Sequence, residues 1–314
     1  MNGSNLVEAS TQSILIPIHD DFVAEPAEDI VFNVVPMPSG NAAIGGTNQS
    51  VLTIENDDIL VFVDGSNNVI FSDTLGLDND ITLKLVNGGV DVRISDAKQS
   101  LSAGNGATQD GPNAVLIPLA SITGGTIDID TLAGNDSLTV DFGGGNFVAP
   151  VTAIDFNGGD PAAGTGDRLS VVGTGSQSTR YSPHATQSDA GTITVSGTAI
   201  GFTGIENVDM NNLASFVFDP PNANDVVNLQ EGTDSATGTQ DALVVSGSSG
   251  GAAFEPVHLW NVGDVLIDTS TSDGADQVQI GAASNNHLID ALRFDTGATG
   301  PDLIKLAGLV TTDV

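Results

Sequence analysis

Apolar residues in this chain come in short runs that are too brief to build helices. Glycine, proline, asparagine, aspartate and threonine interrupt the sequence every several residues, and no window keeps the 3.6-residue apolar period of an amphipathic helix. Between these residues lie runs that are rich in β-branched side chains and alternate apolar with polar positions, such as SILIPI, IVFNVV, ILVFV, ITLKLV, VDVRI and SLTVDF. This alternation is typical of β-strands. The sequence therefore predicts an all-β protein.

A loose repeat occupies the chain from about residue 120 onward. In each copy an apolar residue and an Asp end one strand, a turn rich in Gly or Asn follows, and a second Asp opens the next strand. The copies are IDTLAGNDSLTV (129–140), IDFNGGDPAAGTGDRLSV (154–171), FDPPNANDVVNL (218–229), IDTSTSDGADQVQI (267–280) and FDTGATGPDLIKL (294–306). Asp130 and Asp155 are 25 residues apart, and Asp268 and Asp295 are 27 apart. Such periods are typical of solenoids, because one repeat cannot bury its own apolar face and must stack on the next. We expect residues 115–314 to form a parallel β-solenoid, with a chain of small antiparallel sandwiches as the alternative.

The repeated aspartates allow two interpretations. Asp and Asn stabilise turns by accepting a hydrogen bond from their own backbone two residues on, and this explains the pattern without a metal. The segments AGNDSL and GTGDRLSV also resemble the calcium-binding repeat of RTX β-rolls, although the tandem nine-residue spacing of that family is absent. We favour the turn-stabilising role.

Charge separates this chain from several classes of protein. It has 314 residues, of which 40 are acidic and 7 are basic, and its formal net charge is -33. Such a chain is a poor partner for nucleic acid or for an anionic membrane, since both are bound through Lys and Arg. With 39% apolar residues it is nevertheless expected to fold. It contains no cysteine and no run of about 18 apolar residues, so disulfides and membrane insertion are not expected.

Two acidic clusters lie near the start of the chain, where no Lys or Arg occurs before Lys84. The first is IHDDFVAEPAED and the second is ENDD, which ends the run VLTI. Carboxylates this close repel one another unless a cation neutralises them, and Ca²⁺ takes six to eight oxygen ligands. A solvated acidic rim is the simpler alternative.

Residues 10–58, which hold both clusters, are similar to the C-terminal half of a Calx-β domain. The pattern is a strand, an Asp pair, an acidic loop, a strand, a Gly-containing loop and a strand that ends in acidic residues. The resemblance implies a partial β-sandwich that binds Ca²⁺ at one end. The ligands that it implies are Asp20, Asp21, Glu25, Glu28, Glu55, Asp57 and Asp58. The first half of the domain, from which the family also draws ligands, is missing.

No arrangement of residues predicts catalysis. The four histidines (His19, His184, His258 and His287) are scattered, and no metalloprotease, nucleophile-elbow or P-loop motif holds its expected context. A carboxylate pair for glycoside chemistry can arise by chance among 40 acids, but this chain has one Trp, one Tyr and few arginines to hold a sugar polymer. We therefore expect no catalytic residues.

These observations predict three segments: a partial sandwich (1–58), a hairpin-rich segment that can include the first solenoid coils (59–114), and the repeats (115–314). The leading hypothesis is a fragment of a large secreted or cell-surface bacterial protein that acts as a calcium-stabilised structural or adhesive stalk. A secreted β-helical polysaccharide-active enzyme is one alternative, and a self-assembling extracellular filament or sheath subunit is another. Expected partners are other surface proteins, neutral glycans or further copies of the chain, with no nucleic acid and no membrane insertion.

Overall fold

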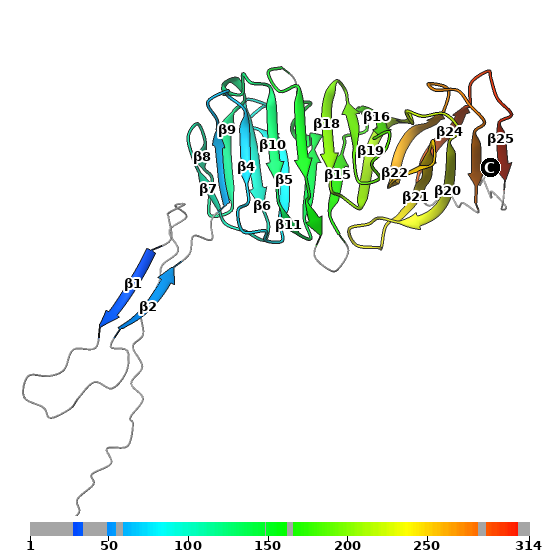
Figure 1. Cartoon of the computed structure of the whole chain (residues 1–314). Helices are drawn as coiled ribbons and strands as arrows, with labels where there is room; N and C mark the ends of the chain where they lie inside the picture. The colour runs from blue at the N-terminus through cyan, green and yellow to red at the C-terminus, as the bar shows by residue number, and fades with distance from the viewer. Residues whose placement is uncertain are drawn as a thin grey trace, which may run out of the picture.

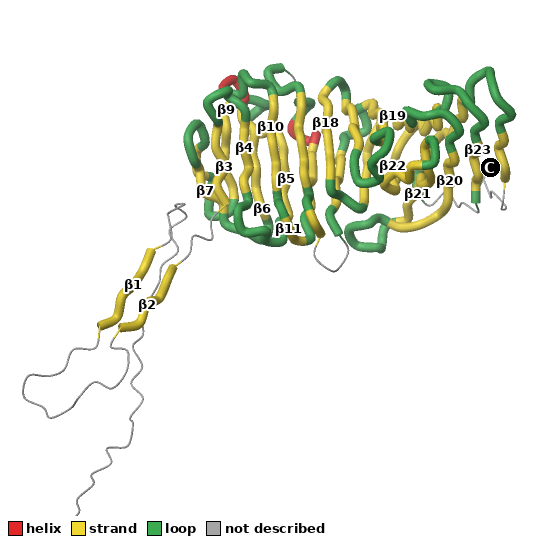
Figure 2. Tube along the Cα trace, viewed as in Figure 1, coloured by secondary structure: helices red, strands yellow, loops and turns green. Residues whose placement is uncertain are grey.

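The structure is a computed structural model that describes residues 28–33, 49–54, 59–147, 149–161, 166–281 and 287–306. These residues form β-strands and two short 3-10 turns, η1 (Leu119–Ser121) and η2 (Phe142–Gly144), with no α-helix among them. The prediction of an all-β protein is confirmed. Figure 1 shows the strands stacked side by side along the molecule, and Figure 2 shows that loops connect nearly all of them at the edges.

A single mixed sheet contains most of the strands and wraps around one core. Its first part comprises β3 (Ile59–Val63), β4 (Val69–Ser72), β5 (Asp80–Val86), β6 (Asp91–Asp96), β7 (Leu101–Ala103), β8 (Thr108–Gln109), β9 (Ala114–Pro118), β10 (Thr126–Asp130), β12 (Ser137–Asp141), β13 (Ala153–Asn157) and β15 (Arg168–Val172). Its second part comprises β16 (Ser178–Pro183), β17 (Gly191–Val195), β18 (Thr198–Thr203), β19 (Asn207–Phe218), β20 (Val226–Thr233), β21 (Asp241–Ser249), β22 (Ala252–Asp268), β23 (Gln277–Ile280), β24 (Ile289–Asp295) and β25 (Leu303–Leu306). Two small pairs complete the described part: β1 (Glu28–Asn33) with β2 (Gln49–Ile54), and β11 (Ala133–Gly134) with β14 (Asp160–Pro161).

Two rows of parallel strands form the body of the stack. One row runs β4, β10, β13, β18, and the other runs β5, β12, β15, β19, β22, β24. Parallel pairing of this kind is the pairing that a β-solenoid uses. Antiparallel meanders are inserted into it, since β16 to β18 and β20 to β22 pair antiparallel in sequence. These insertions account for the longer spacings between repeats in the middle of the chain.

Identical positions of successive strands stack to make the core. In the first row Ile127, Ile154 and Ile200 are register partners, and all three are fully buried. In the second row Leu138, Leu169 and Val208 stack in the same way. Each buried aliphatic side chain of this size contributes about 1.5–3 kcal/mol relative to leaving it in water. The alternating runs in the sequence thus become continuous apolar ladders.

The two ends of the stack differ. At one end the antiparallel strands β6 and β9 cover the core, and their inward side chains, such as Val92 and Ile117, are fully buried. At the other end lies β25, where Ile304 and Leu306 are 48% and 67% exposed although their partners Val278 and Ile280 are buried. Within the described residues no strand pairs with the outer edge of β25. Among the described residues, β25 is therefore the last strand of the stack.

The β1–β2 pair is all that the described residues contain of the predicted sandwich. It is antiparallel and separate from the large sheet (Figure 1). Val31, Val51 and Leu52 are 42–52% exposed, so the two strands alone bury little apolar surface. The domain boundaries at residues 58 and 114 stay predictions, although β4 and β5 already belong to the parallel rows.

Candidate metal centre

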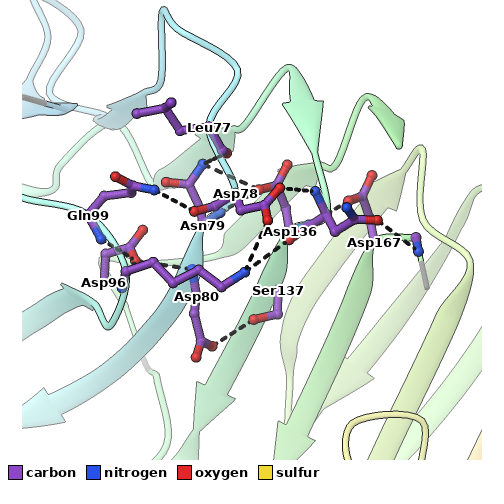
Figure 3. Close-up of polar contacts among 12 residues, drawn as sticks. Leu77, Asp78, Asn79, Asp80, Asp96, Gln99, Asp136, Ser137 and Asp167 are labelled. Atoms are coloured by element: carbon purple, nitrogen blue, oxygen red, sulfur yellow. Dashed lines mark hydrogen bonds and ion pairs between the residues drawn. The ribbon is translucent and has the colours of Figure 1, made fainter. Parts of the chain in front are cut away.

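We call one strand of the first row, the turn that follows it and the next strand of the second row a coil. In each of the first coils an acidic or amide residue ends the turn, directly before the second strand. In the first coils these residues are Asn79, Asp136, Asp167 and Glu206. The Asn79 backbone N–H donates to Asp136 Oδ1 over 2.7 Å, the Asp136 N–H donates to Asp167 Oδ1 over 2.7 Å, and the Asp167 N–H donates to Glu206 Oε2 over 2.5 Å. Figure 3 shows the first two of these contacts. We call this set the corner ladder.

The corner ladder crowds carboxylates that are only partly paired. Asp136 and Asp167 are almost fully buried, and the Oδ2 atom of each has no hydrogen-bond partner. Burial raises the pKa of Asp136 to about 6. Burial, aided by the charges of Asp136 and Glu206, raises the pKa of Asp167 to about 7. The hydrogen bonds of these side chains join neighbouring turns, but burying their carboxylates removes the charges from water, which costs free energy.

A second ladder of the same kind crosses the C-terminal coils. The Asp225 N–H donates to Asp276 Oδ1 over 2.8 Å, and the Asp276 N–H donates to Asp302 Oδ1 over 3.2 Å. The other oxygen of Asp276 accepts a 2.8 Å hydrogen bond from the hydroxyl of Thr269. Burial, together with the charge of Asp276, raises the pKa of Asp225 to about 6, and neither carboxylate oxygen of Asp225 has a partner.

With Asp273, this second ladder contains a cluster of three carboxylates that could hold a metal ion. Asp273 lies in the same turn as Asp276, and carboxylate oxygens of Asp273, Asp276 and Asp302 all lie within 4.8 Å of one another. Asp273 Oδ2 accepts from the Ala298 N–H over 2.9 Å and from the Thr299 N–H over 2.6 Å, whereas its Oδ1 is buried without a partner. Hydrogen bonds from Thr299 lower the pKa of Asp273, so this carboxylate stays ionised.

No basic residue neutralises this cluster within the described part of the chain. The ion pairs found there are Arg93 with Asp110, Lys98 with Asp78, Arg180 with Asp219 and Arg293 with Asp264. Three carboxylates that are drawn together by backbone hydrogen bonds and left without a counter-ion are a set that could hold a metal ion.

Glycines let the two coils approach closely enough to build the cluster. Gly297 has a φ of +83°, and a Cβ atom there would lie 2.6–2.7 Å from the Asp273 carboxylate. Gly300 has a φ of +97°, and its Cβ would collide with the carbonyl of Gly274 in the coil below. Glycine adopts this backbone conformation without a Cβ penalty. The turn 296–302 can therefore fold directly over Asp273.

The sequence-predicted calcium ligands lie almost wholly outside the described residues. Asp20, Asp21, Glu25, Glu55, Asp57 and Asp58 are not among them. Glu28 opens β1, and its backbone pairs with Ile54, the residue directly before Glu55. The structure neither brings the seven residues together nor separates them, and the N-terminal calcium site stays a prediction.

The turn-stabilising role expected for the repeated aspartates is seen for three of the five first aspartates, Asp130, Asp268 and Asp295. Asp268 Oδ1 accepts from the Ser270 N–H and Asp295 Oδ1 from the Gly297 N–H, two residues on in each case. The second aspartates Asp136, Asp167, Asp276 and Asp302 instead accept from a backbone N–H of the neighbouring coil. Strand register also aligns Asp155 with Asp128 rather than with Asp130, whereas Asp268 and Asp295 are partners, as their spacing predicts.

Comparisons with known proteins gave no further guide, since no family model, no curated protein and no solved structure matches this chain. In the part of the chain that is described, no helix is long and apolar enough to cross a membrane.

Proposed function

We propose that this chain is a rod-like structural or adhesive module of a secreted or cell-surface protein, and that its C-terminal coils bind Ca²⁺ at Asp273, Asp276 and Asp302. The observation that carries the proposal is the convergence of these three carboxylates without a basic partner in the described residues. Ca²⁺ favours oxygen ligands at about 2.3–2.6 Å and tolerates irregular geometry, which suits a site that backbone carbonyls and water would complete.

The position of the cluster gives the ion a structural task. Asp273 and Asp276 belong to the turn between β22 and β23, and Asp302 belongs to the turn between β24 and β25. A shared cation would therefore tie the last described coil to the one before it. That coil exposes Ile304 and Leu306, and it gains the least from core packing. The proposed extracellular setting would suit this role, since calcium modules outside the cell work at Kd values of about 10⁻⁴–10⁻³ M.

Thermal unfolding tests the metal centre. Millimolar Ca²⁺ should raise the melting temperature relative to chelator. At a hundredfold excess over Kd, the free energy of unfolding should rise by about 2.7 kcal/mol. Mg²⁺ should have a much smaller effect. The double variant Asp273→Asn with Asp302→Asn should lose most of this calcium response. Asp290→Asn is the control for loss of one surface charge, because Asp290 is exposed on β24 and lies outside the cluster. An equal calcium response in the double variant and in the wild type would remove the proposed site.

A polysaccharide-active enzyme is the second candidate, and one observation favours it. An enzyme on this scaffold needs a groove lined by convergent polar groups. The outer face of β10, β13 and β18 carries a cavity of about 680 Å³ lined by Asp128, Asp155, His184 and neighbouring residues. A polysaccharide panel tests this candidate, with turnover that depends on Asp128 or Asp155 as the supporting result.

A further inference from the structure

The cavity on the outer face of the sheet is built from two elements. Its floor is formed by outward-facing residues of β10, β13 and β18. Its wall is the segment 184–190 between β16 and β17, which is closed by a 2.9 Å hydrogen bond from the His184 N–H to the Ala190 carbonyl. The volume of about 680 Å³ lies within the range of small-molecule sites.

Two carboxylates stand next to each other on the floor. Asp128 and Asp155 are register partners on adjacent parallel strands, which lie about 4.8 Å apart. The next partner in the same line is Gly201, where a Cβ atom would come within 2.6 Å of Asp155 Oδ1. Glycine at this position therefore leaves room both for the Asp155 side chain and for a ligand above it.

Neither carboxylate is neutralised. Thr126 Oγ1 lies 3.3 Å from Asp128 Oδ2, and Asp155 accepts no hydrogen bond from any described residue. Neither takes part in the ion pairs of the described chain, and no Lys or Arg lines the cavity. Partial burial, and then the charge of Asp128, raise the pKa of Asp155. The floor is thus an acceptor-rich surface with uncompensated negative charge.

The wall contributes His184 to the cavity. Its Nδ1 accepts hydrogen bonds from the Gln187 N–H over 3.1 Å and from the Thr186 N–H over 3.3 Å. Hydroxyl groups of Ser182 and Thr192, which are register partners on β16 and β17, line the same cavity.

We propose that this groove binds a primary ammonium group carried by a small hydroxylated or aliphatic molecule. The paired carboxylates of Asp128 and Asp155 would receive the ammonium, and the Ser182 and Thr192 hydroxyls would contact the body of the ligand. Anionic ligands such as phosphates and uronic acids are excluded by the same charge. Amino sugars and short aliphatic diamines both carry this chemistry. The inference does not depend on the metal centre, which lies in different coils.

Calorimetric titration tests the proposal with ligands that differ mainly in charge. The probes are the glucosamine disaccharide, its neutral N,N′-diacetyl form, and 1,5-pentanediamine with 1,5-pentanediol as its uncharged partner. We expect the two amines to bind and the two neutral molecules to bind at least about tenfold more weakly, which corresponds to 1.4 kcal/mol or more. Preference between the two amines then distinguishes a sugar ligand from an aliphatic one.

Two variants locate the binding. Asp155→Asn removes one charge from the floor, and Gly201→Val fills the groove at a strand position whose backbone suits valine. Each should weaken amine binding at least about tenfold, whereas Asp290→Asn should leave it unchanged. Binding should also weaken as pH falls, because Asp155 must be ionised. Absence of amine binding at millimolar concentration, equal binding of charged and neutral probes, or full binding by both groove variants would overturn the proposal.

Discussion

The backbone N–H of Asp136 donates to the Asp167 carboxylate over 2.7 Å, across the corner between two neighbouring coils. Asp136 itself accepts from the Asn79 N–H one coil earlier, also over 2.7 Å. Each corner residue therefore extends the hydrogen bonding of the strands through a turn, where the backbone alone would break the ladder. This bonding fixes the register of the stack, and it places carboxylates above one another in a buried position.

Acidic conditions should stabilise the stack because of these carboxylates. Their pKa values, about 6 for Asp136 and about 7 for Asp167, lie above the value of about 3.9 for an unfolded Asp. The folded chain therefore binds more protons than the unfolded chain between about pH 4 and 7, and its stability falls as pH rises through this window. Melting temperature measured from pH 5 to 8 at constant ionic strength and without calcium should show the decline.

Replacing Asp167 by Asn should flatten this pH dependence. Asparagine keeps an oxygen that can accept from the Asp136 N–H, and it cannot ionise. Asn79 already fills the equivalent position in the first coil. We expect the variant to be more stable than the wild type at pH 8 by about 1 kcal/mol, or about 2–4 °C, after solvent screening is allowed for. An Asp290→Asn control corrects for the change in net charge, and parallel curves for all three proteins would contradict the account.

The N-terminal acidic clusters yield a separate prediction. The predicted N-terminal calcium ligands are Asp20, Asp21, Glu25, Glu28, Glu55, Asp57 and Asp58. If they bind Ca²⁺, then Asp57→Ala with Asp58→Ala should reduce the number of calcium ions bound, while the response of the C-terminal cluster persists. Equilibrium dialysis at millimolar Ca²⁺ measures this stoichiometry. The same stoichiometry in the variant and in the wild type would leave the acidic clusters as a solvated rim.

The exposed apolar residues of β25, the last described strand, predict self-association. Ile304 and Leu306 occupy core positions but are about half to two-thirds exposed (48% and 67%), next to an edge strand. Because β6 and β9 cover the opposite end, association through β25 should give a closed pair rather than a filament. Sedimentation velocity over a range of concentrations should show a dimer that Leu306→Asp abolishes. A wild type that stays monomeric at high concentration would oppose this expectation.

Polysaccharide turnover is not expected. The groove at Asp128 and Asp155 lacks an aromatic platform at its surface and has no arginine or lysine, groups that assist binding and cleavage of sugar polymers. A panel of neutral and acidic polysaccharides, assayed for new reducing ends and for unsaturated products, should give no signal above buffer. Turnover that is lost in Asp128→Asn or Asp155→Asn would establish the enzyme instead.

Period-two alternation and regular turns were enough to predict the all-β class, because strand patterning is a local property. The 27-residue spacing of Asp268 and Asp295 likewise predicted their stacking. The offset between Asp128 and Asp130 could not be predicted, because both positions face outward and only the stacking of Ile127 on Ile154 decides the register. Antiparallel insertions such as β16 to β18 lengthen the spacing between repeats in the middle of the chain, so the repeat period could not be recognised there.

The candidate metal centre could not be predicted because its three aspartates come from two separate turns and resemble ordinary turn residues. Asp273 and Asp302 are brought together by turns in successive coils, and nothing near either residue distinguishes it from the other aspartates in Gly-rich loops. The signal in the sequence was the repeat itself, since the second Asp of stacked repeats must fall on neighbouring coils. The backbone N–H groups of Ala298 and Thr299 donate to Asp273 Oδ2, and this leaves Asp273 Oδ1 without a partner. Only the fold brings these donors to Asp273.

Anomalous diffraction from crystals grown in millimolar calcium tests the central claim most directly. The account predicts a difference peak between the carboxylates of Asp273, Asp276 and Asp302, with ligand distances of about 2.3–2.6 Å, and loss of the peak in the Asp273→Asn, Asp302→Asn variant. A map with no peak between these three residues, in crystals whose calcium concentration also raises the melting temperature in solution, would contradict it.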